Sequence, residues 1–312
     1  MTPADGRARV EIVALAGIGE VRAGDDLATL VLAAAEADPD GPLRDGDVLV
    51  VTSKVVSKSE GRTVPAGERE HWVRAGAVHT VARRGPTRIV RTGTGLTLAA
   101  AGVDNSNVDP GSVLLLPVDP DASAARLRAE LERRTGCRLG VVVSDTLGRA
   151  WRMGQTDTAI GAAGVRVVEA YAGRRDSYGN DLQVTAVALA DELAAAADLV
   201  KAKLAGRPVA LVRGLAHLVD DEPDGARSLV RDPAADMFGY GSREAVLAAV
   251  LAATGQRARY EEVLDLEPAD RADAVLAGAP GLDPQVAAFV RSLLGTDLAA
   301  PAQEKGGDSK SG

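Results

Sequence analysis

The feature that most constrains the fold is the uninterrupted apolar run from Asp47 to Thr52, DVLVVT. Apolar and polar residues do not alternate within it, which is typical of a strand buried on both faces of a sheet. Two further runs, Leu139–Val143 and Pro208–Val212, have the same character. Such strands need helices on both faces to cover them. The sequence therefore predicts an α/β protein with mixed sheets and covering helices.

Helical patterns separate these strands. A strand at Val10–Ala14 and the loop GIGEVRAG precede the helical pattern DDLATLVLAAAEA, with Asp25 near its start. The run Val113–Val118 leads into the amphipathic helix ASAARLRAELERR, and Leu139–Val143 supplies the next strand. This is the spacing of a β-α-β unit. A long Ala/Leu/Val helix is predicted over residues 181–205.

The chain of 312 residues is long enough for one large or two ordinary domains. We predict a main α/β domain over residues 8–240. Residues 241–298 have the pattern of short helices without strands, which predicts a small helical appendage. The last segment, 299–312, is polar and rich in Gly, Ser and Lys, so we expect it to be a disordered tail.

Charge and cysteine content narrow the classes of function. The formal net charge of −8 argues against binding of nucleic acid or an anionic membrane, since both require a basic surface. The single cysteine, Cys137, cannot form an intramolecular disulfide and fits a reducing cytoplasm. No apolar window is long enough to span a membrane, and the first residues lack a signal-peptide pattern. His71, His79 and His217 share no metal-ligand spacing, so a structural role is expected for each.

Two acidic motifs are the strongest candidates for chemistry. AAGVDNSN contains Asp104, and VVVSDTLGRAWRMGQT places Asp145 and Thr146 where an apolar strand is expected to end. Ligands of α/β proteins collect at strand ends. Carboxylate and hydroxyl oxygens, completed by water and phosphate, are the ligands that Mg²⁺ or Mn²⁺ prefers. Alternatively, Asp104 starts an Asx turn and Asp145 caps a helix.

The second motif also carries Arg149, Arg152 and Gln155, which are the candidate catalytic residues. Planar guanidinium groups bind phosphate or carboxylate in a bidentate manner, and this run lacks helical amphipathicity. A further polar loop, GRRDSYGND from Gly173 to Asp181, either recognises substrate or merely joins a strand to the following helix.

Two segments are candidates for phosphate binding. Ser53 and Lys58 in TSKVVSK follow the buried strand, and their hydroxyl and ammonium groups are suited to phosphates, although an exposed polar turn explains them equally well. The segment is not a Walker A motif. Residues 16–19, Ala-Gly-Ile-Gly, follow the first strand and would let a nucleotide approach the backbone, but such a pattern is more often a simple turn.

Taken together, these motifs resemble the coenzyme F420-0 gamma-glutamyl ligase family. The matching pieces occur in the family's order over about residues 8–240: GDDL, DGDVLVVTSKVVSKSEGR, AAAGVDNSNVDPG, SDTLGRAWRMGQTDTAIGAAG, YAGRRDSYGND, ADELAAAADLVKAKL and PVALVRG. Met153 stands where the family pattern commonly has Asn, which puts substrate preference in doubt more than reaction class.

The resemblance implies the fold of that family and a ligase that forms amide bonds. It implies that GTP phosphorylates the acceptor carboxylate of F420-0 and that L-glutamate is then attached through gamma linkages, in coenzyme F420 biosynthesis. It also implies a cytoplasmic homodimer with two divalent ions, Mg²⁺ or Mn²⁺, and K⁺ as a further candidate. The implied metal ligands are Asp104, Asp145 and Thr146, and the implied nucleotide contacts are Ala16, Gly17, Ile18, Gly19, Ser53, Lys58 and Asn107.

Two other functions use the same residue types. A metal-dependent phosphatase or nucleotide hydrolase would employ these acids and arginines with water as the acceptor. A non-catalytic nucleotide-binding regulator would bind GTP without consuming it. The products distinguish the three.

Overall fold

The computed structural model describes residues 9–183, 185–221 and 224–295. Within them the chain divides into two compact units, one made of residues 9–78 and 90–235 and the other of residues 79–89 and 236–295. The predicted tail at 299–312 lies outside the described residues.

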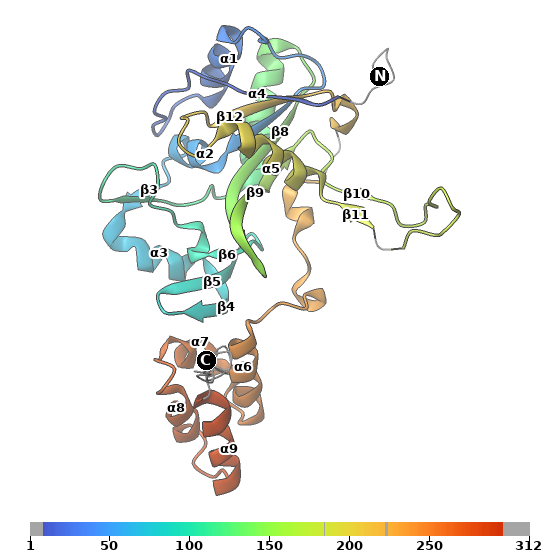
Figure 1. Ribbon diagram of the computed structural model, residues 1–312. Coiled ribbons are helices and arrows are strands. Elements are labelled where there is room, and N and C mark those ends of the chain that lie inside the picture. Colours follow the sequence, from blue (N-terminus) through green and yellow to red (C-terminus); the bar gives the residue numbers. More distant parts are fainter. Residues whose placement is uncertain (1–8, 184, 222–223, 296–312) are drawn as a thin grey trace, which may run out of the picture. The chain divides into compact units, whose positions relative to one another are not determined.

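The first unit is built on a five-stranded sheet of order β1-β12-β2-β8-β9. Strands β12, β8 and β9 of this sheet are labelled in Figure 1. Strands β2 and β8 are parallel, and the other neighbouring pairs are antiparallel. The strands are β1 (Glu11–Ala14), β2 (Val48–Thr52), β8 (Gly140–Arg149), β9 (Arg152–Ala163) and β12 (Val209–Arg213).

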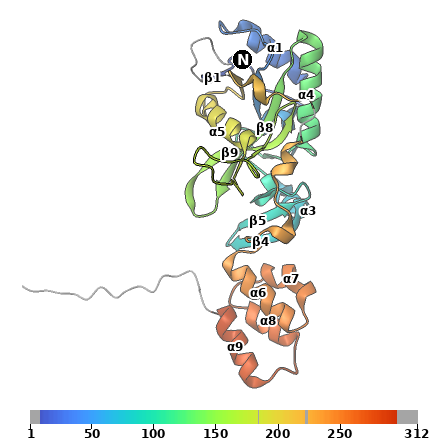
Figure 2. The same cartoon turned by 90° about the vertical axis from the view of Figure 1, so that its right-hand side faces the viewer.

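Helices cover both faces of this sheet, α1 (Leu27–Ala37) and α4 (Pro120–Thr135) on one side and α5 (Leu189–Lys201) on the other (Figure 2). Along β2, Leu49 and Val51 pack with α1 and α4, while the alternate residues pack with α5. All four apolar residues of β2 are fully buried. The predicted α/β architecture with a doubly covered strand is therefore confirmed.

The helix ends follow from their capping residues. Asp26, rather than Asp25, is the N-cap of α1, where its carboxylate accepts hydrogen bonds from the N–H groups of Ala28 and Thr29. Asp119 caps α4, and Gly136 ends it with φ of 72°. The predicted helix over 181–205 was too long, because α5 begins only at Leu189.

The β-α-β unit predicted around α4 was wrong. The strand expected at Val113–Val118 is only β7 (Ser112–Leu114), and it pairs antiparallel with β3 (Thr63–Pro65) in a separate two-stranded sheet. Pro117 has no N–H to donate, so it cannot extend a strand ladder. The parallel partner of β8 is β2 instead.

Shorter elements complete the first unit. They are α2 (Ser53–Ser59), η1 (Ala66–Glu68), α3 (Arg69–Gly76), η2 (Ala100–Gly102), β10 (Glu169–Ala170), β11 (Ala186–Val187), η3 (Ala216–Leu218), η4 (Ala226–Leu229) and η5 (Pro233–Ala235). Strands β4 (Ala77–Arg84), β5 (Thr87–Thr92) and β6 (Thr97–Ala99) form a three-stranded sheet, of which residues 79–89 belong to the second unit. The loop Gly173–Asp181 lies between β10 and β11, and the side chain of Asp176 accepts the N–H groups of Tyr178 and Asn180.

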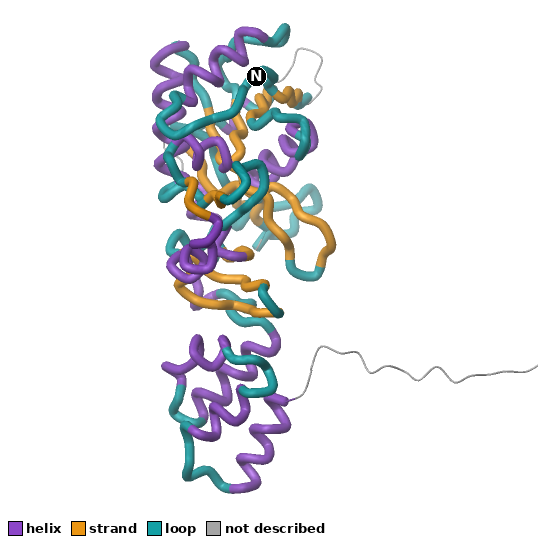
Figure 3. Tube along the Cα trace, turned by 90° about the vertical axis from the view of Figure 1, so that its left-hand side faces the viewer, coloured by secondary structure: helices purple, strands orange, loops and turns teal. Residues whose placement is uncertain are grey.

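The second unit contains helices between 242 and 295, as Figure 3 shows. They are α6 (Ser242–Ala253), η6 (Arg257–Arg259), α7 (Tyr260–Asp265), α8 (Arg271–Ala277) and α9 (Pro284–Gly295). Leu247, Leu251 and Val263 are among its fully buried residues. Segment 79–89 belongs to this unit: the Tyr260 hydroxyl donates to the carbonyl of Thr80, and the Glu244 carboxylate accepts the N–H of Arg83. No described helix is long and apolar enough to cross a membrane.

Candidate functional site

The first turn of α2 brings Asp104 and Asp145 together. Lys54 forms an ion pair with Asp104, and the hydroxyl of the adjacent Ser53 donates to Asp145 at 2.9 Å. Because Ser53 and Lys54 are neighbours in the chain, the two carboxylates converge on one small region although they come from distant segments.

The backbone around Asp104 fixes the direction of its carboxylate. Its N–H and carbonyl pair with Leu114 at 3.0 and 2.7 Å, which ties it to the end of β7. The carboxylate also accepts the N–H of Ser106, so the Asx turn is present. Burial disfavours the charge, but the bonds from Lys54 and Ser106 outweigh it and lower the pKa of Asp104. The Asx turn and a ligand role are compatible, since the carboxylate has further lone pairs.

Asp145 and Thr146 lie within β8, which continues to Arg149 instead of ending at the acid. The alternative that Asp145 caps a helix was therefore wrong. Burial raises the pKa of Asp145 to about 6, against the opposing hydrogen bond from Ser53. The hydroxyl of Thr146 donates to Asp157 on β9 at 2.8 Å. A partly buried carboxylate without a direct basic partner is a suitable place for a cation.

Asp157 and Lys201 form a buried ion pair that the motifs did not predict. The two side chains are 3% and 4% exposed, and Lys201 Nζ lies 2.8 Å from Asp157 Oδ2. Lys201 also donates to Ser144 and Thr52. Burial raises the pKa of Asp157, but the charge of Lys201 and the hydrogen bonds together lower it. The sequence signal for this pair was weak, since Lys201 is simply the last residue of the Ala/Leu-rich helix α5.

A cavity of 470 Å³ lies beside these groups. Its walls include Ile18, Gly19, Lys58, Asn107 and Thr146 from the predicted set. Ala16 and Gly17 are exposed and are not among the lining residues, and Ser53 is buried behind the wall. The lining also includes charged residues that the sequence did not single out: Glu20, Lys54, Asp157, Asp198, Lys203 and Arg207.

Comparison with known proteins identifies the family of the chain. The family model described as F420-0:Gamma-glutamyl ligase matches residues 17–214. The chain belongs to this family. It is 40% identical over 241 residues to the coenzyme F420:L-glutamate ligase of Methanopyrus kandleri, which covers 70% of this chain and 93% of the relative. The proteins of the same name from Archaeoglobus fulgidus and Methanothermobacter thermautotrophicus are 39% and 37% identical, with 66% and 73% of this chain and 88% and 98% of each relative covered.

The family motif TSKVVSK is helical, not a loop. Ser53 begins α2, and Ser53 and Ser57 are almost completely buried. Neither a phosphate loop nor an exposed turn is formed there. Lys58 still reaches the cavity wall, where it pairs with Glu20 at 2.5 Å.

Arg149, Arg152 and Gln155 lie away from the acids. They are exposed at the tip of the β8–β9 hairpin, where Arg149 pairs with Arg152 in register and donates to the carbonyl of Met153 at 3.2 Å. Arg149 lies four residue steps along the strand from Asp145, about 14 Å away. The structure therefore does not bring the candidate catalytic arginines to the acid pair within one chain.

The donor set suits a hard cation that shares its coordination with phosphate. Among the described residues no group of three or more His, Cys, Asp or Glu could enclose a metal ion. Two carboxylates and the Thr146 hydroxyl leave most positions to water and ligand oxygens, as is usual for Mg²⁺ beside a nucleotide. The histidines take no part: His79 stacks on Tyr260 in the second unit, and His71 packs edge-on against Trp72. Cys137 donates to the carbonyl of Leu43.

Proposed function

We propose that the chain is a GTP- and divalent-metal-dependent ligase that joins L-glutamate to coenzyme F420-0 through gamma linkages, in coenzyme F420 biosynthesis. Membership of the family and the names of its relatives support the ligase class. The observation that carries the metal and nucleotide part is the convergence of Asp104 and Asp145 at the first turn of α2, beside a cavity with several lysines.

In this proposal the cavity binds GTP with its phosphates toward α2. Lys58, Lys203 and Arg207 pair with phosphate oxygens, and Asn107 and the backbone at Ile18–Gly19 contact the rest of the nucleotide. Asp104, Asp145 and Thr146 hold Mg²⁺ or Mn²⁺, with K⁺ as a further candidate. When bound, the divalent ions neutralise charge on the transferred phosphoryl group.

The reaction proceeds in two transfers. An acceptor carboxylate oxygen attacks the γ-phosphorus of GTP, the bond to GDP breaks, and an acyl phosphate forms. The glutamate amine then attacks the carbonyl carbon, a C–N bond replaces the C–O bond, and phosphate and a proton leave. Positioning and charge neutralisation are the main requirements, so no protein nucleophile is needed.

The exposed tip of the β8–β9 hairpin has a different proposed role from the acid pair. We infer that the enzyme is a cytoplasmic homodimer, and that Arg149, Arg152 and Gln155 bind anionic substrate groups from this exposed tip. The exposure of the three side chains and the absence of an acid between them in the motif support that role.

The decisive experiment is mass spectrometry of the deazaflavin after incubation with GTP, Mg²⁺ or Mn²⁺ and glutamate, with GDP measured in parallel. The ligase gives a glutamyl mass gain and glutamate-dependent GDP release. GDP release without glutamate and without a mass gain would identify a nucleotide hydrolase, and GTP that survives prolonged incubation would identify a regulator.

A further inference from the structure

A second cavity, of 430 Å³, opens in the first unit, and its lining includes Ala101 and Val103, just before Asp104 in the chain. It falls in the range of about 300–1,000 Å³ typical of small-molecule sites. Its walls are mainly aliphatic, from Leu96, Val103 and Leu115, and the indole of Trp72 adds an aromatic surface. The indole N–H donates to Glu68 at 3.1 Å, which fixes the orientation of the ring. This combination suits a planar heterocycle.

The charge of this cavity has one sign. Arg62 and Arg227 are its charged lining residues, and neither forms an ion pair with a described residue. Arg62 uses its Nε to donate to the carbonyl of Leu116 at 3.1 Å, so its terminal nitrogens are held in place. The guanidinium of Arg62 is thus oriented at the wall, whereas the side chain of Arg227 is exposed, and both are suited to an anion.

The backbone at the cavity wall is strained. Ala100 and Ala101 have φ of 51° and 53°, in the left-handed region that residues with a Cβ seldom adopt. Backbone strain of this kind concentrates at ligand sites. Ala101 lines the cavity, and two residues further on Val103 does so as well.

The strained segment leads directly to the acid pair. Val103 is extended, with φ of −72° and ψ of 111°, so its side chain and that of Asp104 point to opposite sides of the chain. Asp104 is paired with Leu114, and the next residue, Leu115, is again part of the cavity wall. The paired segments 103–104 and 114–115 therefore face the cavity on one side and carry the Asp104 carboxylate on the other. A ligand that occupies both the cavity and the acid site must be elongated.

We propose that this cavity binds the ring end of the acceptor, with the deazaflavin against Trp72 and the phosphodiester on Arg62 and Arg227. The carboxylate arm of the acceptor then extends around the wall toward Asp104. This assignment rests on the proposed function, since it takes F420-0 as the acceptor. It adds three residues that determine which acceptor is used and that take no part in binding GTP.

The test is fluorescence titration of the full chain with F420-0 and, separately, with 5-deazariboflavin, which lacks the phospholactyl arm. We expect Arg62→Gln and Arg227→Ala each to raise the Kd for F420-0 by about 10- to 100-fold, the effect of one lost charged hydrogen bond. The Kd for 5-deazariboflavin stays unchanged in both. Trp72→Ala weakens binding of both compounds, and Trp72→Phe restores most of it. The KM for GTP stays at the wild-type value throughout.

The matched control is Arg133→Ala, an exposed arginine about 20 Å along α4 from the cavity residue Pro120. Circular dichroism and thermal melts verify that each variant is folded. Variants that bind F420-0 like the control, or that weaken GTP instead, overturn the cavity assignment, as does a wild-type chain that does not bind F420-0. If the wild type binds F420-0 through these residues but shows no glutamate-dependent GDP release, the proposed function fails and the cavity assignment stands.

Discussion

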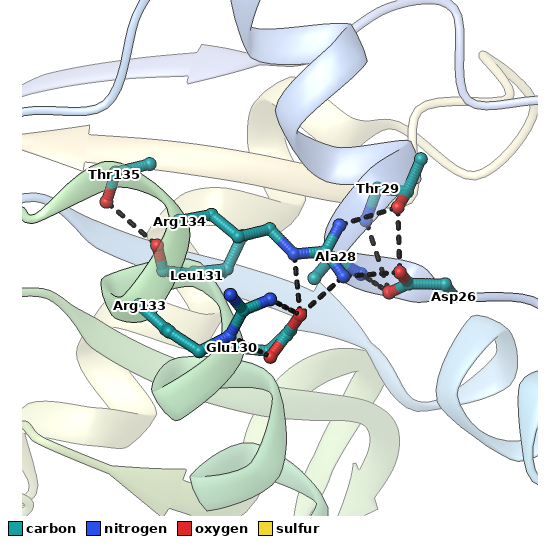
Figure 4. A network of polar contacts seen from close by, with 8 residues as sticks. All are labelled: Asp26, Ala28, Thr29, Glu130, Leu131, Arg133, Arg134 and Thr135. Carbon is teal, nitrogen blue, oxygen red and sulfur yellow. Dashed lines mark hydrogen bonds and ion pairs between the residues drawn. The ribbon is translucent and has the colours of Figure 1, made fainter.

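Two networks of charged groups in the first unit use the same chemistry in different surroundings. On the outer face, Arg134 bridges Asp26 of the α1 cap and Glu130 of α4, with both contacts at 2.5 Å (Figure 4). Under the sheet, Lys201 contacts Asp157 at the longer distance of 2.8 Å. Asp26 is 49% exposed and Asp157 only 3%. This difference indicates that burial, and not contact distance, determines how strongly loss of one partner lowers the free energy of unfolding. Water can replace the lost partner of the exposed pair but not that of the buried pair.

The largest effect is a loss of activity, expected when Asp104 or Asp145 near the 470 Å³ cavity is substituted. Asp104→Ala and Asp145→Ala each remove a proposed cation ligand, so glutamate-dependent GDP release should fall by about 10³-fold or more. The measurement is GDP release at saturating metal, GTP and glutamate. Asp109→Ala, an exposed acid in the same loop, is the control. Near-normal turnover of either variant would show that the metal assignment is wrong.

The next largest effect concerns stability. Lys201→Met leaves Asp157 buried without its counter-ion, which should lower the free energy of unfolding by about 3–5 kcal/mol in urea denaturation. Lys201→Met combined with Asp157→Asn should recover part of the loss, since the uncompensated charge is gone. Equal destabilisation in the single and double variants would indicate that lost packing, and not charge, is responsible.

A much smaller effect is expected on the outer face. Arg134→Ala breaks contacts with both Asp26 and Glu130, but these groups are partly exposed and return to water. The melting temperature should fall only slightly, and the difference from the wild type should shrink in 1 M NaCl. Ligase activity should not change. A loss of stability as large as that of Lys201→Met would show that the exposed pair matters as much as the buried one.

The smallest effect is a pH dependence of the same network. Hydrogen bonds from Thr29 and Arg134 lower the pKa of Asp26 to about 2, and those from Arg133 and Arg134 lower that of Glu130 to about 2. A carboxylate with a depressed folded pKa stabilises the protein above its unfolded pKa, about 4, and this contribution is lost as the pH falls toward 2. Melting curves between pH 5 and 2 should therefore show a smaller acid-induced loss in Arg134→Ala than in the wild type.

The sequence predicted those parts of the fold that are set by local pattern. The buried run of β2 is visible as an unbroken apolar stretch, and the α4 helix and the helices beyond 241 are visible as hydrophobic periodicity. The pairing of β7 with β3 was not, because both are three residues long and no pattern specifies a partner. Segment TSKVVSK looked like a loop because its polar side chains are serines and lysines, yet two of those serines are buried in α2.

The candidate site was predictable only where a local sequence motif marks its residues. Asp104 and Asp145 stand out as acids in distinctive polar motifs, and the structure places both at α2. Lys201 and Asp157 could not be found, since their pairing depends on the packing of α5 against β9. Arg149 and Arg152 are close to Asp145 in sequence, but a strand carries them away from it at about 3.4 Å per residue.

The attachment of both acids to consecutive residues of α2 has a mechanical consequence. Ser53 holds one carboxylate and Lys54 the other, so a small rotation of this single helical turn would displace the two together. The backbone of each acid is anchored elsewhere, that of Asp104 by its bridge to Leu114 and that of Asp145 within β8, so α2 links two separately held segments.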